Sequence, residues 1–150
     1  MTAFFMDTSA VVKRYVSEAG SAWVTSLAAP ETGNVLVISR LATVEVCSVL
    51  ARLQRSNKLP SSDSTRLRID FLSHVDTQYL TITVDDDTLL RARDLVPKYP
   101  LRTLDAIQLA CALEATTALD EALTFLCSDN DLLNAAAGEG FTIDNPLAYP

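Results

Sequence analysis

Short apolar runs alternate along the chain with longer segments in which apolar residues recur every three or four positions. The short runs predict strands at residues 2–6, 35–39, 79–84, 123–128 and 141–143. The longer segments predict helices at residues 9–16, 21–28, 41–55, 63–75, 85–99, 104–116 and 131–138. Strands separated by helices are typical of an α/β fold with a mainly parallel sheet. Ligands of such sheets bind beyond the carboxyl ends of the strands, so the residues that follow the strands are the first candidates for chemistry.

The length of 150 residues, 49% of them hydrophobic, suits one domain over residues 1–150 with one sizeable core. No apolar run approaches the roughly 20 residues that cross a bilayer. The N-terminal segment carries an Asp where a signal peptide would stay apolar, so we expect a cytoplasmic protein that does not enter the membrane. Cys47, Cys111 and Cys127 lie among apolar residues and are expected as buried thiols, not disulfides or zinc ligands.

Charge and residue counts exclude several classes of function. The net charge of −7 argues against nucleic-acid binding through a broad basic surface, although an enzyme could still reach phosphates through metal ions and a few arginines. The single histidine, His74, excludes a ribonuclease with two catalytic histidines, and we expect this side chain to be solvated. The chain has four glycines and neither a G-x-G-x-x-G nor a P-loop pattern, which argues against nucleotide binding through the usual loops.

Two predicted strands run directly into an aspartate, Asp7 after the first and Asp129 after the fourth. If both strands are parallel members of one sheet, both carboxylates reach the same edge. The alternative is that each aspartate only caps the helix that follows, because Asp is a favoured N-cap. Ser9 is also a plausible cap for the first helix.

Two more carboxylates stand on predicted helices. Glu45 has no cation three or four positions away, so no pair within its own helix accounts for it. It either has a partner from elsewhere or faces solvent. Asp105 falls in the first turn of the most hydrophobic helix, where the helix dipole favours negative charge. Thr103 is the expected N-cap of that helix, and Arg102 is available to pair with Asp105.

The four carboxylates carry more weight as a set. Two like charges about 4 Å apart cost on the order of 4 kcal/mol at an effective dielectric constant near 20, which a marginally stable fold tolerates only if a positive group binds. Mg²⁺ or Mn²⁺ prefers an all-oxygen shell, activates water and offsets charge on a phosphate. We therefore predict a catalytic metal site for phosphoryl chemistry formed by Asp7, Glu45, Asp105 and Asp129. Either Glu45 or Asp129 would orient the attacking water.

At these residues the sequence resembles the PIN-domain nucleases, and more closely the VapC-type toxins of bacterial toxin–antitoxin pairs. The resemblance covers nearly the whole chain, and its most specific piece is the Leu-Asp-Ala block around Asp105. It rests on an ordered set of segments: Asp7-Thr8-Ser9, the helical Glu45, the block LRTLDAIQLA at residues 101–110, Ser128-Asp129 followed by Leu132 and Ala135-Ala136, and GFTI at residues 140–143 with Asn145-Pro146.

The resemblance implies a PIN-like three-layer α/β/α sandwich with a mainly parallel central sheet. It also implies a Mg²⁺- or Mn²⁺-dependent endoribonuclease and a cognate antitoxin protein that blocks it. The four acidic ligands of the family correspond, in order, to Asp7, Glu45, Asp105 and Asp129. Ser9 resembles the hydroxyl that often helps to hold the first Asp or its water. Asp131 is an extra carboxylate that either shares the role of the fourth ligand or faces solvent.

An acidic pocket suits an arginine from the antitoxin, because a guanidinium binds a carboxylate through two parallel hydrogen bonds. Apolar residues on the two early helices are candidates for the rest of that interface, with ordinary core packing as the alternative: Val11, Val12, Trp23, Val24 and Leu27. The RNA target, the antitoxin and a homodimer are left open by the sequence.

Two other functions fit parts of the pattern. A catalytically inactive PIN-like domain would bind RNA or protein without cutting, but the complete acidic set argues against it. A phosphatase of the haloacid dehalogenase type also begins with a strand and an Asp. It needs a second Asp two residues later, where this chain has Ser9.

Overall fold

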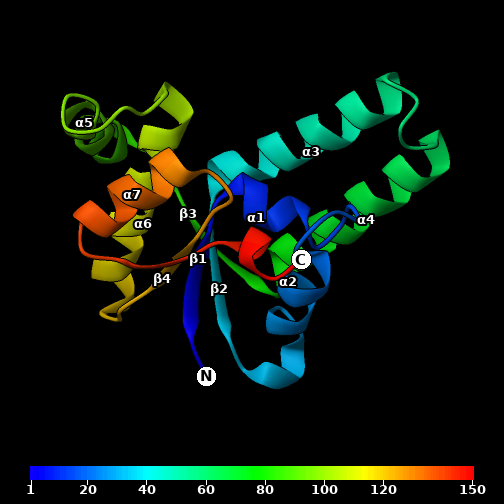
Figure 1. Ribbon diagram of the computed structural model, residues 1–150, viewed down its shortest axis with the longest axis horizontal. Helices are drawn as coiled ribbons and strands as arrows, with labels where there is room; N and C mark the ends of the chain where they lie inside the picture. The colour runs from blue at the N-terminus through cyan, green and yellow to red at the C-terminus, as the bar shows by residue number, and fades with distance from the viewer.

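The computed structural model describes all 150 residues and is built on a five-stranded sheet with the order β3-β2-β1-β4-β5 (Figure 1). Each pair of neighbouring strands is parallel, which confirms the predicted α/β fold class. The central strand β1 pairs through Phe5 with Val37 on one side and with Phe125 on the other. The strands are β1 (Ala3–Met6), β2 (Val35–Ser39), β3 (Tyr79–Ile82), β4 (Thr124–Leu126) and β5 (Thr142–Asp144).

All seven predicted helices are present, with two short 3₁₀ turns at Pro30–Thr32 and Pro146–Ala148. The helices are α1 (Thr8–Val12), α2 (Ser21–Leu27), α3 (Arg40–Arg55), α4 (Ser61–Thr77), α5 (Asp86–Leu95), α6 (Thr103–Leu119) and α7 (Asn130–Gly138). Two of them end earlier than predicted. The first stops at Val12, and α5 stops at Leu95, shortly before Pro97, which has no N–H for the helical hydrogen-bond ladder.

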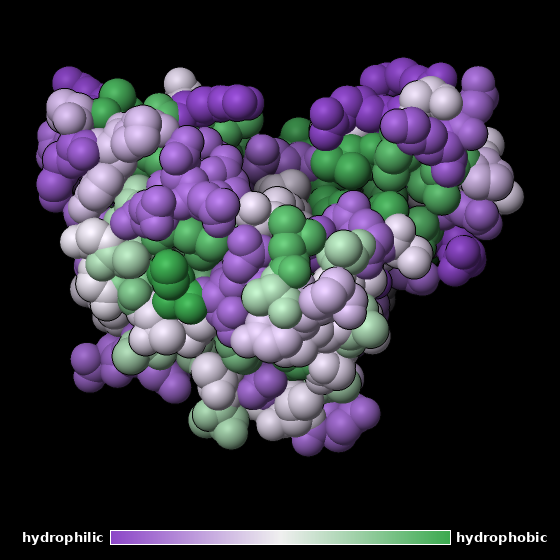
Figure 2. Space-filling view, in the orientation of Figure 1, coloured by the Kyte–Doolittle hydropathy of each residue, from purple (hydrophilic) through white to green (hydrophobic).

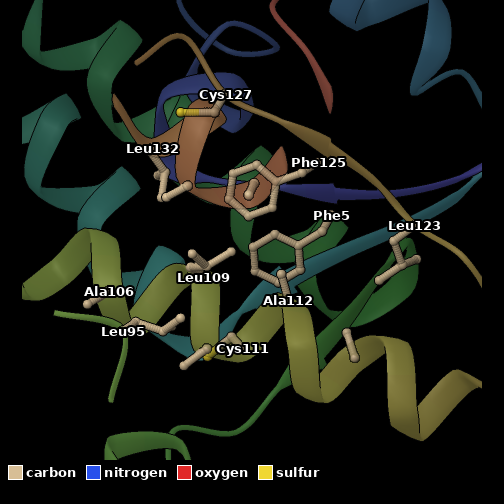
Figure 3. Close-up of a cluster of buried hydrophobic side chains, with 14 of the residues drawn as sticks. Phe5, Leu95, Ala106, Leu109, Cys111, Ala112, Leu123, Phe125, Cys127 and Leu132 are labelled. Atoms are coloured by element: carbon tan, nitrogen blue, oxygen red, sulfur yellow. The ribbon is translucent and has the colours of Figure 1, made fainter. Parts of the chain in front are cut away.

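Helices cover both faces of the sheet, which confirms the three-layer α/β/α arrangement. Side chains alternate between the faces along each strand, so Phe5 joins one hydrophobic core and the next residue, Met6, joins the other. The first core lies under α5, α6 and α7, and Figure 3 shows the Phe5 and Phe125 rings stacked at its centre with centroids 5.4 Å apart. The second core lies under α1–α4 and includes Phe71 and Leu50.

Helices α3 and α4 pack along each other and project from the sheet at the upper right of Figure 1. On the other side of the molecule stand α5, α6 and α7. The hairpin is held to the body near its base, where Phe71 of α4 is fully buried and contacts Tyr15 and Tyr79.

One prediction about an individual residue is wrong, and for the apolar set on the early helices the alternative of core packing is confirmed. His74 is not solvated, because Tyr15 Oη lies 2.8 Å from His74 Nδ1 and half-buries the ring against the second core. The apolar set on the early helices is not an interface: Val11, Val12, Val24 and Leu27 are buried core residues. Trp23 is half-buried, and Tyr149 stacks on it with ring centroids 4.1 Å apart. The C-terminal segment therefore covers the one apolar side chain of that set that reaches the surface.

The cysteine prediction holds in most respects. All three thiols are free, with Cys111 and Cys127 buried and Cys47 half-buried. None of the helices is long and apolar enough to cross a membrane.

Candidate active site

Asp7 and Asp129 lie at the same edge of the sheet, at the carboxyl ends of the neighbouring strands β1 and β4, as predicted. Both also cap helices. Asp7 Oδ1 accepts from Ala10 N at 3.2 Å, and Asp129 Oδ1 accepts from Asp131 N at 2.8 Å. Capping engages one oxygen of each carboxylate. The other oxygen of Asp7 has only a thiol partner, Cys127, so capping and ligand binding are compatible at both positions.

Ser9 holds Asp7 in place. Its Oγ donates to Asp7 Oδ1 at 2.6 Å and accepts from the backbone N–H of Ser128 at 3.0 Å, which ties α1 to the end of β4. The expectation that Ser9 caps the first helix is wrong, since that helix begins at Thr8 with Asp7 as its cap.

Glu45 is half-buried and has its partners on other helices. Thr8 Oγ1 of α1 donates to Glu45 Oε1 at 2.8 Å, and Gln108 Nε2 of α6 donates to the same oxygen at 3.0 Å. Glu45 has no cation three or four positions away on its own helix, and two neutral donors from other helices hold its carboxylate in place. One carboxylate oxygen, Oε2, is left without a protein partner.

Asp105 stands in the first turn of α6 and is half-buried. The expected N-cap is wrong by one residue: the helix begins at Thr103, and Arg102 occupies the cap position without a side-chain capping bond. No ion pair joins Arg102 to Asp105. Arg102 still acts on Asp105, because its backbone and its charge both lower the pKa of that carboxyl.

The carboxylates influence one another electrostatically. Burial raises the pKa of Asp7 to about 6 against the hydrogen bonds from Ser9, Cys127 and Ala10, and the charge of Asp105 adds to the rise. Burial, then the charge of Asp129 and more weakly that of Glu45, raise the pKa of Asp105. Burial is the main cause of both shifts, and the neighbouring carboxylates add to it, while the backbone and the charge of Arg102 lower the pKa of Asp105 in part.

Two adjoining hollows give access to this edge of the sheet. A pocket of about 440 Å³ is lined by Glu45, Arg102, Thr103, Leu104, Asp105 and Asp129. A groove of about 640 Å³ shares Glu45 and Leu104 with it and continues along α3 as far as Arg52. Asp7 is only 7% exposed and lines neither hollow, whereas the next two residues, Thr8 and Ser9, line the groove.

The donor chemistry suits a hard divalent cation, because the candidate ligands are carboxylate oxygens whose charges repel one another. As the side chains stand, no group of three or more His, Cys, Asp or Glu is close enough to hold a metal ion. The four carboxylates gather at one sheet edge without closing around a single point. Asp131 is exposed at the start of α7, as in its solvent-facing interpretation.

Three residues with contacts to the candidate ligands were not singled out from the sequence. Thr8 and Gln108 bind Glu45, and the buried Cys127 thiol lies 3.2 Å from Asp7 Oδ2. Gln108 carried a signal, since it is a polar residue in an otherwise apolar helix, three positions after Asp105 and so on the same helical face. Cys127 carried none, because its apolar neighbours predict only a buried thiol.

Comparison with solved structures identifies the same fold in toxin–antitoxin proteins. A chain of a toxin–antitoxin complex from Klebsiella pneumoniae is 18% identical, with a TM-score of 0.60 and coverage of 95% of this chain and 97% of that one. A chain of VapBC2 from Rickettsia felis, bound to a DNA fragment from its promoter, is 11% identical, with a TM-score of 0.66 and coverage of 96% of this chain and 98% of that one. A chain of FitAcB from Neisseria gonorrhoeae is 14% identical, with a TM-score of 0.60 and coverage of 95% of this chain and 97% of that one.

No curated protein matches the chain by sequence. The sequence does match the PIN domain family, over residues 4–138. That range contains all five of the acidic residues considered above and every element from β1 to α7 except the first residue of β1. The chain therefore belongs to the PIN-domain family.

Proposed function

We propose that the chain is a Mg²⁺- or Mn²⁺-dependent endoribonuclease and the toxin of a toxin–antitoxin pair. PIN domains are generally nucleases, and the similar structures include toxin–antitoxin complexes. The observation that carries the proposal is the gathering of Asp7, Glu45, Asp105 and Asp129 at one sheet edge, where burial, and to a smaller extent the neighbouring carboxylates, raise the pKa of Asp7 and Asp105.

These four side chains would hold the metal. When bound, Mg²⁺ or Mn²⁺ would lower the pKa of water and offset negative charge on the phosphate. Glu45 is suited to orient the attacking water and take up its proton, because Thr8 and Gln108 fix Oε1 while Oε2 has no protein partner. Asp129 is the alternative for this task, with Oδ1 fixed by the backbone of α7.

The test is cleavage of RNA by the purified chain, free of any partner, in the presence of Mg²⁺ or Mn²⁺. Cleavage should stop in EDTA and return when excess metal is added. Cleavage that persists in EDTA would exclude the metal mechanism. Absence of cleavage with either metal on a full cellular RNA extract would favour the alternative of an inactive PIN-like binding domain.

The proposed antitoxin would cover the hollows next to the carboxylates. Its apolar contacts are on other residues than the sequence suggested: Val44 is 68% exposed and Leu104 is 47% exposed, and both line the groove. An Arg or Lys of the antitoxin would enter the neighbouring acidic pocket, where charge-assisted hydrogen bonds are worth about 1.5–3 kcal/mol each.

Adding the antitoxin to the enzyme should stop RNA cleavage. Changing its inserted Arg or Lys to Ala should restore much of the activity. Val44→Ser in the enzyme should weaken inhibition while the Ile69→Ser control, at an exposed apolar position on α4, should not. Full inhibition by an antitoxin segment stripped of all Arg and Lys would show that steric cover alone blocks the site.

A further inference from the structure

Positive charge is concentrated on the projecting hairpin, although the chain as a whole is acidic. Residues 40–68, from the start of α3 to the middle of α4, contain six of the twelve Lys and Arg but two of the nineteen Asp and Glu. This stretch, the basic arm, therefore carries a net charge of +4, while the remaining residues together carry −11. In Figure 2 the arm, at the upper right, has a hydrophilic rim that surrounds a hydrophobic patch on the face turned to the viewer.

The basic arm is continuous with the carboxylate site. Glu45, Ser48, Arg52 and Arg55 are spaced by three, four and three residues, which puts them on one face of α3. The groove is lined by the first three of them. With a rise of 1.5 Å per residue, Arg52 lies about 10.5 Å along the helix axis from Glu45.

The cations of this face are available to a ligand. Arg52 and Arg55 are exposed, as is Lys58 in the turn that follows, and none of them forms an ion pair. Two cations on the body near the groove are engaged: Lys13 pairs with Glu18 at 2.9 Å, and Arg14 hydrogen-bonds Tyr79 and Gln78. Arg91, Arg93 and Arg102 are exposed without an ion pair, but they do not line the groove. Free charge is thus found where the groove leaves the acidic site.

We propose that the basic arm is the track along which single-stranded RNA enters the site, with Arg52 and Arg55 binding phosphates on one flank of the cleaved bond. This rests on the proposed function. An acidic site repels a polyanion, so cations beside it are needed to retain the strand. A duplex rises about 3.4 Å per nucleotide along its axis and an unpaired strand is more extended, so Arg52 would meet a phosphate at most about three nucleotides from the one at Glu45.

The basic arm contains no aromatic side chain on which a base could stack. Its contacts are therefore to phosphates, and binding through the arm should be insensitive to sequence and sensitive to salt. Sequence preference in cleavage would have to come from the pocket around Asp105.

The test compares Arg52→Gln/Arg55→Gln with Arg91→Gln/Arg93→Gln, a control that removes the same charge from exposed positions of α5. Binding of a labelled 15-nucleotide oligouridine is measured by anisotropy in EDTA over a range of salt concentrations. The arm variant should bind about tenfold more weakly at low salt. Its slope of log K against log salt should fall in magnitude by about 1.4, the value for two single-strand phosphates. The control should stay within twofold of the parent.

Cleavage separates the track from the site. With Mg²⁺, the arm variant should raise KM for a long RNA and leave kcat and the cleavage of a trinucleotide unchanged, because a trinucleotide does not reach Arg52. Thermal melts should confirm that both variants fold as the parent does. If the α5 control lost as much RNA affinity as the arm variant, the effect would come from the total charge of the protein and not from the arm. If the arm variant bound RNA normally but was inhibited less by the antitoxin, the arm would be a binding site for an acidic peptide. Either of these two results would overturn the proposal.

Failure of the underlying function has a different signature. If neither the parent nor any variant cuts RNA, the nuclease proposal fails. The anisotropy measurement needs no cleavage, so it still decides whether the arm binds a single strand.

Discussion

Gln108 on α6 donates a hydrogen bond of 3.0 Å to Glu45 on α3, so a buried amide of one helix fixes a carboxylate of another. The other amide atom, Gln108 Oε1, is buried without a partner. An unpaired buried acceptor costs about 1–3 kcal/mol, so this residue contributes poorly to stability. Its contribution is the position of Glu45.

Gln108→Leu should therefore lower kcat for RNA by about tenfold or more, the usual effect of losing a group that orients a metal ligand. KM should change little, and the melting temperature should stay the same or rise. Steady-state kinetics and a thermal melt check this. The matched control is Thr116→Val, which removes a half-buried polar group further along α6 and should leave kcat unchanged. A drop of several degrees in melting temperature with normal kcat would make Gln108 a structural residue.

Asp7 gives a prediction about pH. Its pKa is about 6 in the folded chain, against 3.8 for an ordinary aspartate, which represents the unfolded chain. Between these pH values the folded state binds more protons than the unfolded state, so the folded state loses stability as pH rises through them. Asp7→Asn should remove this loss and stabilise the metal-free protein by about 3 kcal/mol at pH 7. The Asn oxygen retains the cap to Ala10.

Denaturant unfolding in EDTA at pH 4 and pH 7 measures this difference. The gap between variant and parent should open as pH rises and should be small at pH 4. A variant that is less stable than the parent at pH 7 would mean that the folded protein stabilises the charge of Asp7, contrary to its raised pKa.

Asp129 and Asp131 form a matched pair two residues apart on the same helix end. Asp129→Asn should abolish cleavage while preserving the fold, because an Asn side chain still accepts the backbone hydrogen bonds that cap α7. Asp131→Asn removes the same charge from an exposed side chain and should leave kcat/KM within about twofold of the parent. Equal loss in both variants would contradict the assignment of Asp129 alone to the site.

Metal binding should be visible without any substrate. A ligand that binds only the folded state at one hundred times its Kd stabilises by about 2.7 kcal/mol, so Mg²⁺ should raise the melting temperature of the parent by several degrees. Asp105→Asn should lose this increase and Asp131→Asn should keep it. If Ca²⁺ or Mg²⁺ shifts all three proteins alike, the ion binds elsewhere on the acidic surface.

Much of this fold was readable from the sequence because each element carries its own periodic signal. Residues 35–39 are a strand in both the prediction and the structure, and the strongest helical pattern, at residues 41–55, misses only Arg40. The order of strands was not readable, since β1 pairs with β2 and β4 through contacts far apart in the chain. Local patterns contain no information about such pairings.

The candidate carboxylates could be proposed because an aspartate at a strand end has a defined place in a parallel sheet. Their neutral partners could not. Thr8 and Gln108 reach Glu45 from segments 37 and 63 residues away, and only the packing of α1 and α6 against α3 brings them together. Trp23 failed for the same reason, because its covering residue, Tyr149, comes from the opposite end of the chain.

The pairing of β1 with β4 sets when the protein can become active during synthesis. Asp129 leaves the ribosome some 120 residues after Asp7, although β1 and β4 are neighbours in the sheet, with Phe5 opposite Phe125. Contacts this distant in sequence form late in folding. A nascent or truncated chain that lacks β4 therefore has no fourth carboxylate and no support for the end of β1. On the proposed function, the ribosome that makes this protein is not exposed to its activity until β4 and Asp129 have been made.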